Sequence, residues 1–219
     1  MKTALLISGQ VRDGTRYLKA VKRFAIDGVD PDVFIHSYEC EQQGEIESFY
    51  RPKGAVWEDP EQGHGVDSDT VGRYESRKDR ATTTSVENCL KQWRKRRLAF
   101  DMLPSRYDRV AVTRFDCYGV CQLCNHLHLE DIVVPQHYGW GYGVCDLFAS
   151  GPWEKMRYYC RLGEMIPVYI EGGIKFHPET LLRFHLDMRL DEHAPPIWTG
   201  VPLGMFLRGR AFSDPPPIQ

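Results

Sequence analysis

The side chains best suited to chemistry stand just beyond a short apolar run, Val110 to Val112, that predicts a buried strand. These side chains are Arg114 and Asp116. In open α/β sheets, ligands bind outside the carboxyl ends of the strands. A carboxylate there can hold a divalent cation, and a neighbouring arginine can contact the phosphates that the cation carries. We therefore take Asp116 as a candidate metal ligand and Arg114 as a candidate phosphate contact. The alternative for Asp116 is the capping of a turn.

Two more carboxylates are candidates for proton transfer. Asp146 follows the glycine-rich aromatic segment HYGWGYG and could bind hydroxyl groups of a substrate or act as a base. Glu179 stands after Pro178 in the first turn of a predicted helix, where the helix dipole alone favours an acidic side chain. His177 is a further candidate metal ligand, with a hydrogen-bonded structural role as the alternative. The aromatic residues of HYGWGYG suit either sugar stacking or loop packing: Tyr138, Trp140 and Tyr142.

A polar segment, GQVRDGTR, follows the first predicted strand, Thr3 to Ser8. That strand is apolar without alternation, which is typical of a central strand covered on both faces. The glycines of GQVRDGTR have the spacing of the phosphate-binding loop G-x-x-x-x-G-K-[ST], but Thr15 stands in the position of the lysine. We therefore expect a polar loop before a helix N-terminus, a suitable place for a nucleotide. The residues it offers to a nucleotide are Ser8, Gly9, Gln10 and Arg12.

Alternating strands and helices must position these residues. A helix predicted over Thr15 to Ile26 and a strand over Pro31 to His36 complete a β–α–β unit, which implies parallel strands. The clearest helix runs from Thr84 to Leu103, with Ser85 as its N-cap. Its basic run, Arg94 to Arg97, is predicted to be solvated surface, with phosphate contact as the alternative. The other predicted elements are strands at Gly54–Trp57 and Ile132–Pro135, a loop at Pro60–Asp69, helices at Pro152–Leu162 and from Pro178, and a last strand within PIWTGVPLGMFLRGR.

Length and composition predict one globular α/β domain over residues 1–212, followed at 213–219 by a proline-rich tail or a linker to further domains. The chain has 219 residues, of which 42% are hydrophobic and 26% are charged, and these fractions are ordinary for a soluble protein. A net charge of −2 provides no basic field for nucleic acid. We expect no signal peptide and no membrane span. Seven cysteines without an export signal favour free thiols and a cytoplasmic protein.

Five segments together resemble small GT-A-type glycosyltransferases of polysaccharide-synthesis loci and large algal (chlorella-type) viruses. They are LLISGQVRD (Leu5–Asp13), DVFIHS (Asp32–Ser37), YDRVAVTRFD after the long helix, CDLFASGPWEKM (Cys145–Met156) and HPETLLRFHL (His177–Leu186). The resemblance spreads over most of the chain and depends on the order and spacing of these segments.

This resemblance implies a single Rossmann-like GT-A domain with a central, mostly parallel sheet flanked by helices. It implies transfer of a sugar from a nucleotide donor, commonly UDP, to a glycan or glycoprotein acceptor. It also implies Mn²⁺ or Mg²⁺ bound to an Asp-x-Asp-like element, here Arg114-Phe115-Asp116, in which arginine replaces the first carboxylate. For a viral member the compartment would be the host cytoplasm.

Two alternative functions use the cysteines that follow Asp116. Cys117, Cys121 and Cys124 have a spacing that resembles the cluster loop of radical S-adenosylmethionine enzymes, and three thiolates can hold a [4Fe–4S] cluster. The late position of this motif, with too few residues after it for most of a barrel, argues against that class. Zinc would suit the histidines nearby, His126 and His128, in a non-catalytic, zinc-stabilised carbohydrate-binding module. We expect ordinary free thiols instead.

Overall fold

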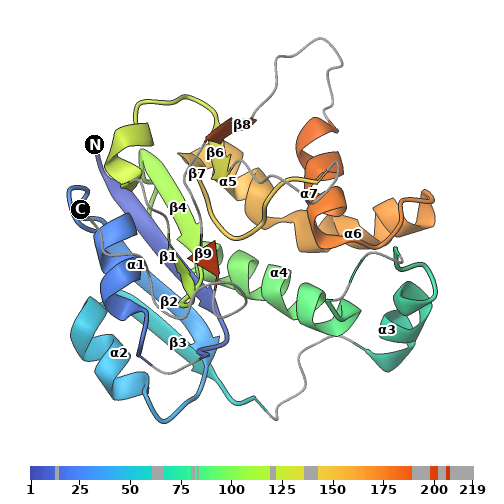
Figure 1. Ribbon diagram of the computed structural model, residues 1–219, viewed down its shortest axis with the longest axis horizontal. Coiled ribbons are helices and arrows are strands. Elements are labelled where there is room, and N and C mark those ends of the chain that lie inside the picture. Colours follow the sequence, from blue (N-terminus) through green and yellow to red (C-terminus); the bar gives the residue numbers. More distant parts are fainter. Residues whose placement is uncertain are drawn as a thin grey trace.

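The computed structural model describes residues 1–12, 15–60, 67–79, 82, 84–118, 122–135, 143–188, 198–201 and 206–207. A seven-stranded sheet forms the centre of the molecule (Figure 1). In spatial order its strands are β3 (Gly54–Glu58), β2 (Asp32–Tyr38), β1 (Thr3–Gly9), β4 (Arg109–Thr113), β7 (Ala149–Pro152), β6 (Ile132–Pro135) and β8 (Trp198–Val201). All run parallel except β7, which is antiparallel to both of its neighbours. The predicted mixed α/β class with a mostly parallel sheet is therefore confirmed.

Strand β1 lies inside the sheet because its sequence can be buried on both faces. Thr3 to Ser8 are all buried. Successive side chains of a strand point to opposite faces, so Leu6 belongs to the core on one face and Leu5 to the core on the other. Leu5 lies opposite Val33 of β2 and Ala111 of β4. The predicted β–α–β unit with parallel strands is present.

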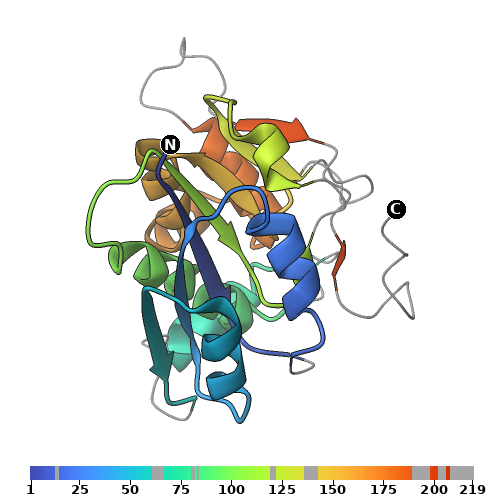
Figure 2. The same cartoon turned by 90° about the vertical axis from the view of Figure 1, so that its left-hand side faces the viewer.

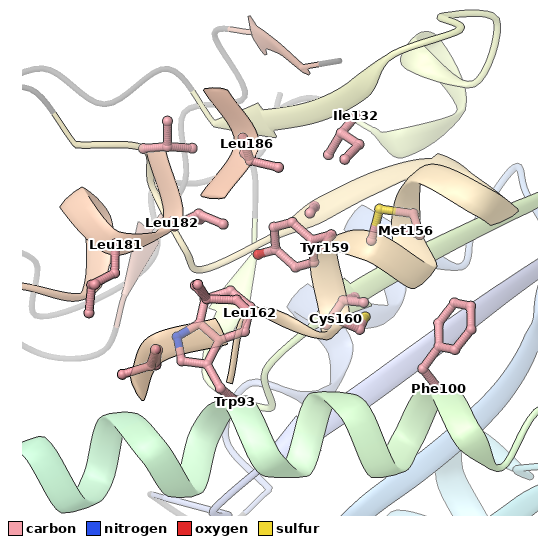
Figure 3. Close-up of a cluster of buried hydrophobic side chains, with 14 of the residues drawn as sticks. Trp93, Phe100, Ile132, Met156, Tyr159, Cys160, Leu162, Leu181, Leu182 and Leu186 are labelled. Carbon is pink, nitrogen blue, oxygen red and sulfur yellow. The ribbon is translucent and has the colours of Figure 1, made fainter. Parts of the chain in front are cut away.

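Helices cover both faces of the sheet, as Figures 1 and 2 show from two directions. One face carries α1 (Leu18–Ala25), α2 (Gln43–Tyr50) and a 3₁₀ helix, η1 (Leu123–His126). The other carries α3 (Ser68–Glu75), α4 (Val86–Asp101), α5 (Trp153–Cys160), α6 (Leu162–Glu171) and α7 (Pro178–Asp187). In the core on this second face, Trp93 of α4, Tyr159 of α5 and Leu182 of α7 are buried together (Figure 3).

A second, two-stranded sheet lies next to the candidate site. β5 (Cys117–Tyr118) starts directly after Asp116 and pairs antiparallel with β9 (Phe206–Leu207). A segment from late in the chain is thereby joined to the residues that follow β4. Among the helices that the structure describes, none has the length and apolar character needed to cross a bilayer.

Several predicted boundaries hold and others shift. Ser85 caps α4 as predicted, since its hydroxyl oxygen accepts a hydrogen bond of 3.2 Å from the backbone N–H of Asn88. Helix α1 begins at Leu18 rather than Thr15, because residues 15–17 form a turn in which the Thr15 carbonyl accepts from Leu18. Helix α5 ends at Cys160, two residues before the predicted end. The predicted last strand is divided into β8 and β9.

Six of the described elements were not predicted: α2, α3, α6, β5, β7 and the 3₁₀ helix η1. The end of the predicted loop at Pro60–Asp69 belongs to α3 instead, because the Asp67 carboxylate accepts a hydrogen bond of 2.7 Å from the Thr70 N–H and caps the helix. Residues 61–66 of that loop and the predicted tail at 213–219 lie outside the described residues.

The prediction of a solvated surface for Arg94–Arg97 is wrong for two of its four residues. Lys95 and Arg96 are each only 1% exposed. Both lie on the side of α4 that also buries Trp93 and Ala99, so the helix turns their long side chains toward the sheet. Each has an acidic partner there, as expected for a buried basic side chain and described below.

Candidate functional site

The order of strands reverses between β1 and β4, and this reversal positions the site. The chain passes from β1 to β2 and β3 on one side, and only later to β4 on the other. In open α/β sheets, ligands bind at such a point, outside the carboxyl ends of the strands. Ile7 of β1 lies opposite Thr113 of β4, so both strands end at the same level. The loop after Gly9 and the segment Arg114–Asp116 therefore begin at one edge of the sheet.

The four candidate nucleotide-binding residues at the end of β1 and in the loop after it differ in exposure. Ser8 is 1% exposed, whereas Gln10 and Arg12 face solvent. Gly9 has a φ of 106°, a backbone conformation that favours glycine. Its carbonyl oxygen accepts a hydrogen bond of 2.7 Å from the Ser37 hydroxyl of β2. The strand end is thus held in place, and Gln10 and Arg12 are among the side chains of this loop that a ligand can reach.

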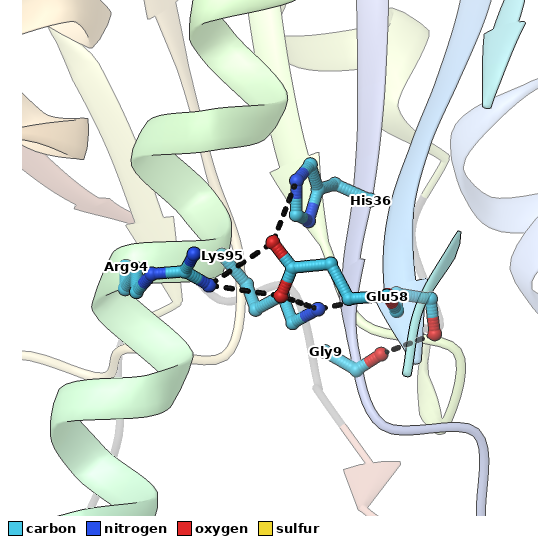
Figure 4. A network of polar contacts seen from close by, with 6 residues as sticks. Gly9, His36, Glu58, Arg94 and Lys95 are labelled. Carbon is cyan, nitrogen blue, oxygen red and sulfur yellow. Dashed lines mark hydrogen bonds and ion pairs between the residues drawn. The ribbon is translucent and has the colours of Figure 1, made fainter. Parts of the chain in front are cut away.

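An ion-pair network joins α4 to this edge of the sheet (Figure 4). Glu58, at the end of β3, accepts hydrogen bonds of 2.7 Å from Lys95 and 2.8 Å from Arg94. Lys95 also donates to the Ser37 carbonyl at 2.8 Å. The Nε2 atom of His36 lies 3.6 Å from the Glu58 carboxylate. The network therefore holds α4 in one position along its axis relative to the carboxyl ends of β2 and β3.

The network shifts the ionisation of two of its members. Burial, followed by the charge of Lys95, lowers the pKa of His36 to about 4, so the imidazole is neutral at pH 7. Burial tends to raise the pKa of Glu58, but the hydrogen bonds from Arg94 and Lys95 outweigh it and lower that pKa to about 2. Glu58 is therefore the fixed negative centre of the network.

Arg114 and Asp116 form a two-pronged ion pair just beyond β4. Nε and Nη2 of Arg114 donate to Oδ1 and Oδ2 of Asp116 at 2.8 and 2.7 Å. The Asp116 side chain is 2% exposed and the Arg114 side chain 17%. Burial disfavours the charged guanidinium, but Asp116 and then Asp146 outweigh it and raise the pKa of Arg114 above its usual value. Arg114 is thus a permanent cation with one side engaged by Asp116.

Asp146 lies at the same edge of the sheet because it comes just before β7, which runs antiparallel to β4. Ala149, the first residue of β7, lies opposite Val112 near the end of β4, so the residues just before β7 lie alongside those just after β4. The Asp146 carboxylate accepts a hydrogen bond of 2.8 Å from Gln92 of α4. Arg96 donates to the Asp146 carbonyl, and its Nη1 lies 3.8 Å from the Asp146 carboxylate. Two residues of α4 therefore hold Asp146.

Sequence reasoning missed Gln92 and Arg96 as site residues. Arg96 was placed on the helix surface, and Gln92 drew no attention. A usable signal was present, because Arg96 shares a helical spacing with Cys89, Trp93 and Phe100, which are all buried. A charged residue on the apolar side of a helix predicts a buried partner.

Glu179 lies beside Asp146 in a buried position. Burial, followed by the negative charge of Asp146, raises the pKa of Glu179 to about 7. The helix dipole, which alone would lower it, is therefore outweighed. The backbone N–H of Val144 donates to the Glu179 carbonyl at 3.0 Å. A Cβ atom on Gly143 would lie 2.5 Å from the Cβ of Glu179, so only glycine permits this approach.

His177 has a structural position. Its Nδ1 accepts a hydrogen bond of 3.4 Å from the Thr180 N–H, which caps α7, and lies 3.4 Å from the Glu179 carboxylate. Burial lowers the pKa of His177, so the ring is neutral at pH 7. The alternative prediction for His177, a hydrogen-bonded structural residue, describes these contacts.

The implied divalent metal does not fit the residues that the structure describes. Both oxygens of Asp116 bind Arg114, and His177 uses Nδ1 for the helix cap. Within the described part of the chain, no three side chains of histidine, cysteine, aspartate or glutamate come together as a metal would require.

The cysteines of the proposed cluster motif lie in different surroundings. Cys117 is buried with Cys145 and Leu147, and burial raises the pKa of its thiol. Cys124 lies against Gly28, at the end of α1. Cys121 and the aromatic residues Tyr138, Trp140 and Tyr142 lie outside the described residues. The free-thiol prediction and the metal alternatives for this motif stay predictions.

Two surface hollows lie away from these residues. One, of about 600 Å³, is lined by residues of α1 and of the α2 region, Lys22, Glu45, Ser48, Phe49 and Arg51. The other, of about 230 Å³, lies between α3, α4 and α6. The second is lined in part by Arg94 and Arg97, but neither is lined by Arg114, Asp116, Asp146 or Glu179. The convergence of charged groups, rather than a cavity, therefore defines the site.

The site therefore combines a carboxylate pair, Asp146 and Glu179, with a cation, Arg114, at the carboxyl-terminal edge of a mostly parallel sheet. Such a combination can accept a proton from a hydroxyl group and balance an anionic leaving group. No known protein-family model matches the chain, and no curated protein sequence is significantly similar to it.

Proposed function

We propose that the protein is a glycosyltransferase that moves a sugar from a nucleoside-diphosphate donor to a hydroxyl group of a glycan or glycoprotein acceptor. The observation that carries the proposal is that the buried Asp146 lies close enough to both Glu179 and Arg114 for its charge to shift the pKa of each. Sugar transfer requires a base for the acceptor hydroxyl and positive charge for the departing diphosphate. Both are available at this edge of the sheet.

The resemblance supports the same proposal, because its segments coincide with the site. LLISGQVRD covers β1 and the start of its loop, and CDLFASGPWEKM covers Asp146, β7 and half of α5. HPETLLRFHL covers His177, Glu179 and most of α7. We propose on this basis that the mixed α/β fold is of the GT-A type and that UDP is the nucleotide.

The proposed reaction assigns the proton to Glu179. The ionised carboxylate removes the proton from the acceptor hydroxyl while that oxygen forms a bond to the anomeric carbon of the sugar. The bond between the anomeric carbon and the phosphate oxygen breaks, and its electron pair leaves with the nucleoside diphosphate. A pKa of about 7 lets Glu179 be ionised in half of the molecules at neutral pH and still hold the proton once it has arrived.

Asp146 has a different part in the proposed reaction. Its carboxylate is oriented by Gln92 and Arg96, so its oxygens are in defined positions. A fixed carboxylate of this kind suits hydrogen bonds to sugar hydroxyls. Its negative charge also keeps the proton affinity of Glu179 high.

The test is a screen of nucleotide-sugars for binding and for release of nucleoside diphosphate. A bound donor at a hundred times its dissociation constant should add about 2.7 kcal/mol to the free energy of unfolding. Release should fall by about 10²- to 10⁴-fold in Glu179→Gln, because the base is lost. Glu154→Gln, an exposed acid in the first turn of α5, is the matched control. The proposal fails if no nucleotide-sugar binds or is consumed, or if Glu179→Gln is as active as the control.

A further inference from the structure

We infer that the guanidinium of Arg114 takes the place of a divalent cation at the donor diphosphate, so that the donor binds without metal. The inference rests on the proposed function, since it needs a nucleoside diphosphate at this edge of the sheet. It departs from the metal that the resemblance implies, and its basis is the geometry of Arg114 and Asp116.

The carboxylate that would hold a metal is already in use. Asp116 accepts two hydrogen bonds from Arg114, at 2.8 and 2.7 Å, one on each oxygen. Its side chain is only 2% exposed. A metal-binding carboxylate must present an oxygen to an ion that keeps further oxygen ligands or waters around it. Asp116 offers its oxygens to the guanidinium instead.

Arg114 has hydrogen-bond donors left after this pairing. A guanidinium carries five N–H groups, and Asp116 uses the one on Nε and one on Nη2. None of the other residues that the structure describes accepts a hydrogen bond from Arg114, so three N–H groups stay available. The side chain is 17% exposed, and a planar fork of this kind suits two phosphate oxygens at once. Asp116 is then a positioning residue that holds the guanidinium of Arg114 in one orientation.

Two cations of α4 near this edge are less suited to the diphosphate than Arg114. Lys95 is bound by Glu58 and by the Ser37 carbonyl, and Arg96 is bound by Asp146. Both are 1% exposed. Arg114 differs from them because it combines partial exposure with free donors, directly after the central strand pair.

The experiment measures the affinity of the full chain for UDP, with GDP and ADP alongside, by calorimetric titration in EDTA and again with excess Mn²⁺ or Mg²⁺. We expect the dissociation constant to agree within about twofold between the two conditions, since Arg114 needs no metal. Loss of Arg114 alone would leave Asp116 buried without a partner and could unfold the protein. The test variant is therefore R114Q/D116N, which replaces the ion pair with two neutral amides.

R114Q/D116N should bind the nucleoside diphosphate about 10- to 100-fold more weakly, as expected for loss of charged hydrogen bonds. Arg106→Gln, an exposed arginine before β4 at the opposite end of that strand, should bind like wild type. Binding that needs Mn²⁺ or Mg²⁺, or that is unchanged in R114Q/D116N, would overturn the inference and leave the proposed function standing. Absence of binding by all three nucleotides in both conditions would overturn the proposed function, and the inference with it.

Discussion

The ionisation of Glu179 shows how two local effects compete at one residue. An acid in the first turn of a helix is stabilised in its charged form by the helix dipole, typically by 0.3–1 kcal/mol. Burial and the charge of Asp146 act in the opposite direction and raise the pKa from 4.5 to about 7. At 1.36 kcal/mol per pKa unit, these effects together are worth about 3 kcal/mol, so they decide the outcome.

This pKa predicts that Glu179 weakens the fold at high pH. Its proton is bound more tightly in the folded than in the unfolded state, so the free energy of unfolding falls as the pH rises from about 4.5 to about 7. Glu179→Gln should therefore match wild type at pH 5 and be more stable by up to about 3 kcal/mol at pH 8. Urea unfolding at both pH values measures this, with Glu154→Gln as the exposed control. Equal effects of Glu179→Gln at the two pH values would contradict the raised pKa.

Tyr159 provides a second test at the scale of one residue. It is fully buried, and its hydroxyl has no hydrogen-bond partner among the groups that the structure describes. Removal of an unsatisfied buried hydroxyl restores the free energy lost on its desolvation, so Tyr159→Phe should stabilise the fold by about 1 kcal/mol. Tyr107→Phe is the counterpart, because it loses a 2.9 Å hydrogen bond to Asp32 and should destabilise the fold by about 1 kcal/mol. Denaturant unfolding that finds both variants destabilised alike would show that the Tyr159 hydroxyl is satisfied.

Helix α4 is the element on which the site depends. From one side it supplies Lys95 to the network around Glu58, and it also supplies Gln92 and Arg96 to Asp146. A shift of the helix along its axis would therefore disturb both strand ends and the candidate catalytic pair. The ion pairs that fix its position are consequently part of the support of the site.

Loss of Glu58 should be costly because it leaves Lys95 buried without a counter-charge. We expect Glu58→Ala to destabilise the fold by about 3–5 kcal/mol. Replacement of Lys95 by Met in that background should recover part of the loss, since the buried charge is then gone.

Glu164→Ala is the matched control for this element. Glu164 pairs with Arg97 of the same helix, but both side chains are about 40% exposed, at 41% and 38%. Its loss should cost less than about 1 kcal/mol. Similar unfolding midpoints for Glu58→Ala and Glu164→Ala in denaturant would mean that the network contributes no more than a surface ion pair.

The elements that sequence patterns predicted are those with strong local signals. β1 and β4 have apolar runs, α4 has its Ser85 cap, and α7 starts at Pro178. β7 escaped prediction because Ala149 to Gly151 lack the branched and aromatic side chains of typical strands. Its strand conformation comes from its place between β4 and β6, a tertiary effect that no local pattern shows.

Helix α6 and the residues around Asp146 escaped prediction for related reasons. α6 contains Pro167, which reads as a helix breaker, although its neighbours remain helical. Asp146, Glu179 and Arg114 could each be proposed from position and residue type. Their mutual charge effects, and the ion pair that engages Asp116, depend on distances between segments far apart in the chain. Sequence patterns carry no information on those distances.

At the scale of the whole molecule, buried neutral histidines predict a loss of stability in acid. Burial lowers the pKa of His36 and of His185 to about 4 from 6.5. Each binds its proton less tightly in the folded state, so the free energy of unfolding falls as the pH drops from about 6.5 toward 4. Glu179 has the opposite effect, because its raised pKa makes the free energy of unfolding rise as the pH drops from about 7 to 4.5. Glu179 therefore offsets part of the effect of the two histidines.

The net prediction is a fall of about 2 kcal/mol in the free energy of unfolding between pH 6.5 and 4.5. In Glu179→Gln the opposing contribution is absent, so the fall should be about twice as large. Urea unfolding of both proteins at pH 6.5, 5.5 and 4.5 measures the difference. Parallel pH dependences for the two proteins would show that Glu179 does not titrate as its burial requires.

The antiparallel strand β7, which pairs with the middle strand β4, affects how the protein folds during translation. Once Thr113 has left the ribosome, the first four strands can pair, β1 to β4. β4 is then an edge strand of this partial sheet. Its residues Arg109–Thr113, which are all buried in the folded protein, are exposed along with a row of unpaired backbone groups. β7 emerges later by about 36 residues, a delay of roughly 2–7 s at ordinary rates of translation. During that interval the bare edge of β4 can pair with a strand of another nascent chain, so slow translation after residue 113 should increase aggregation, and a chaperone that shields β4 should reduce it.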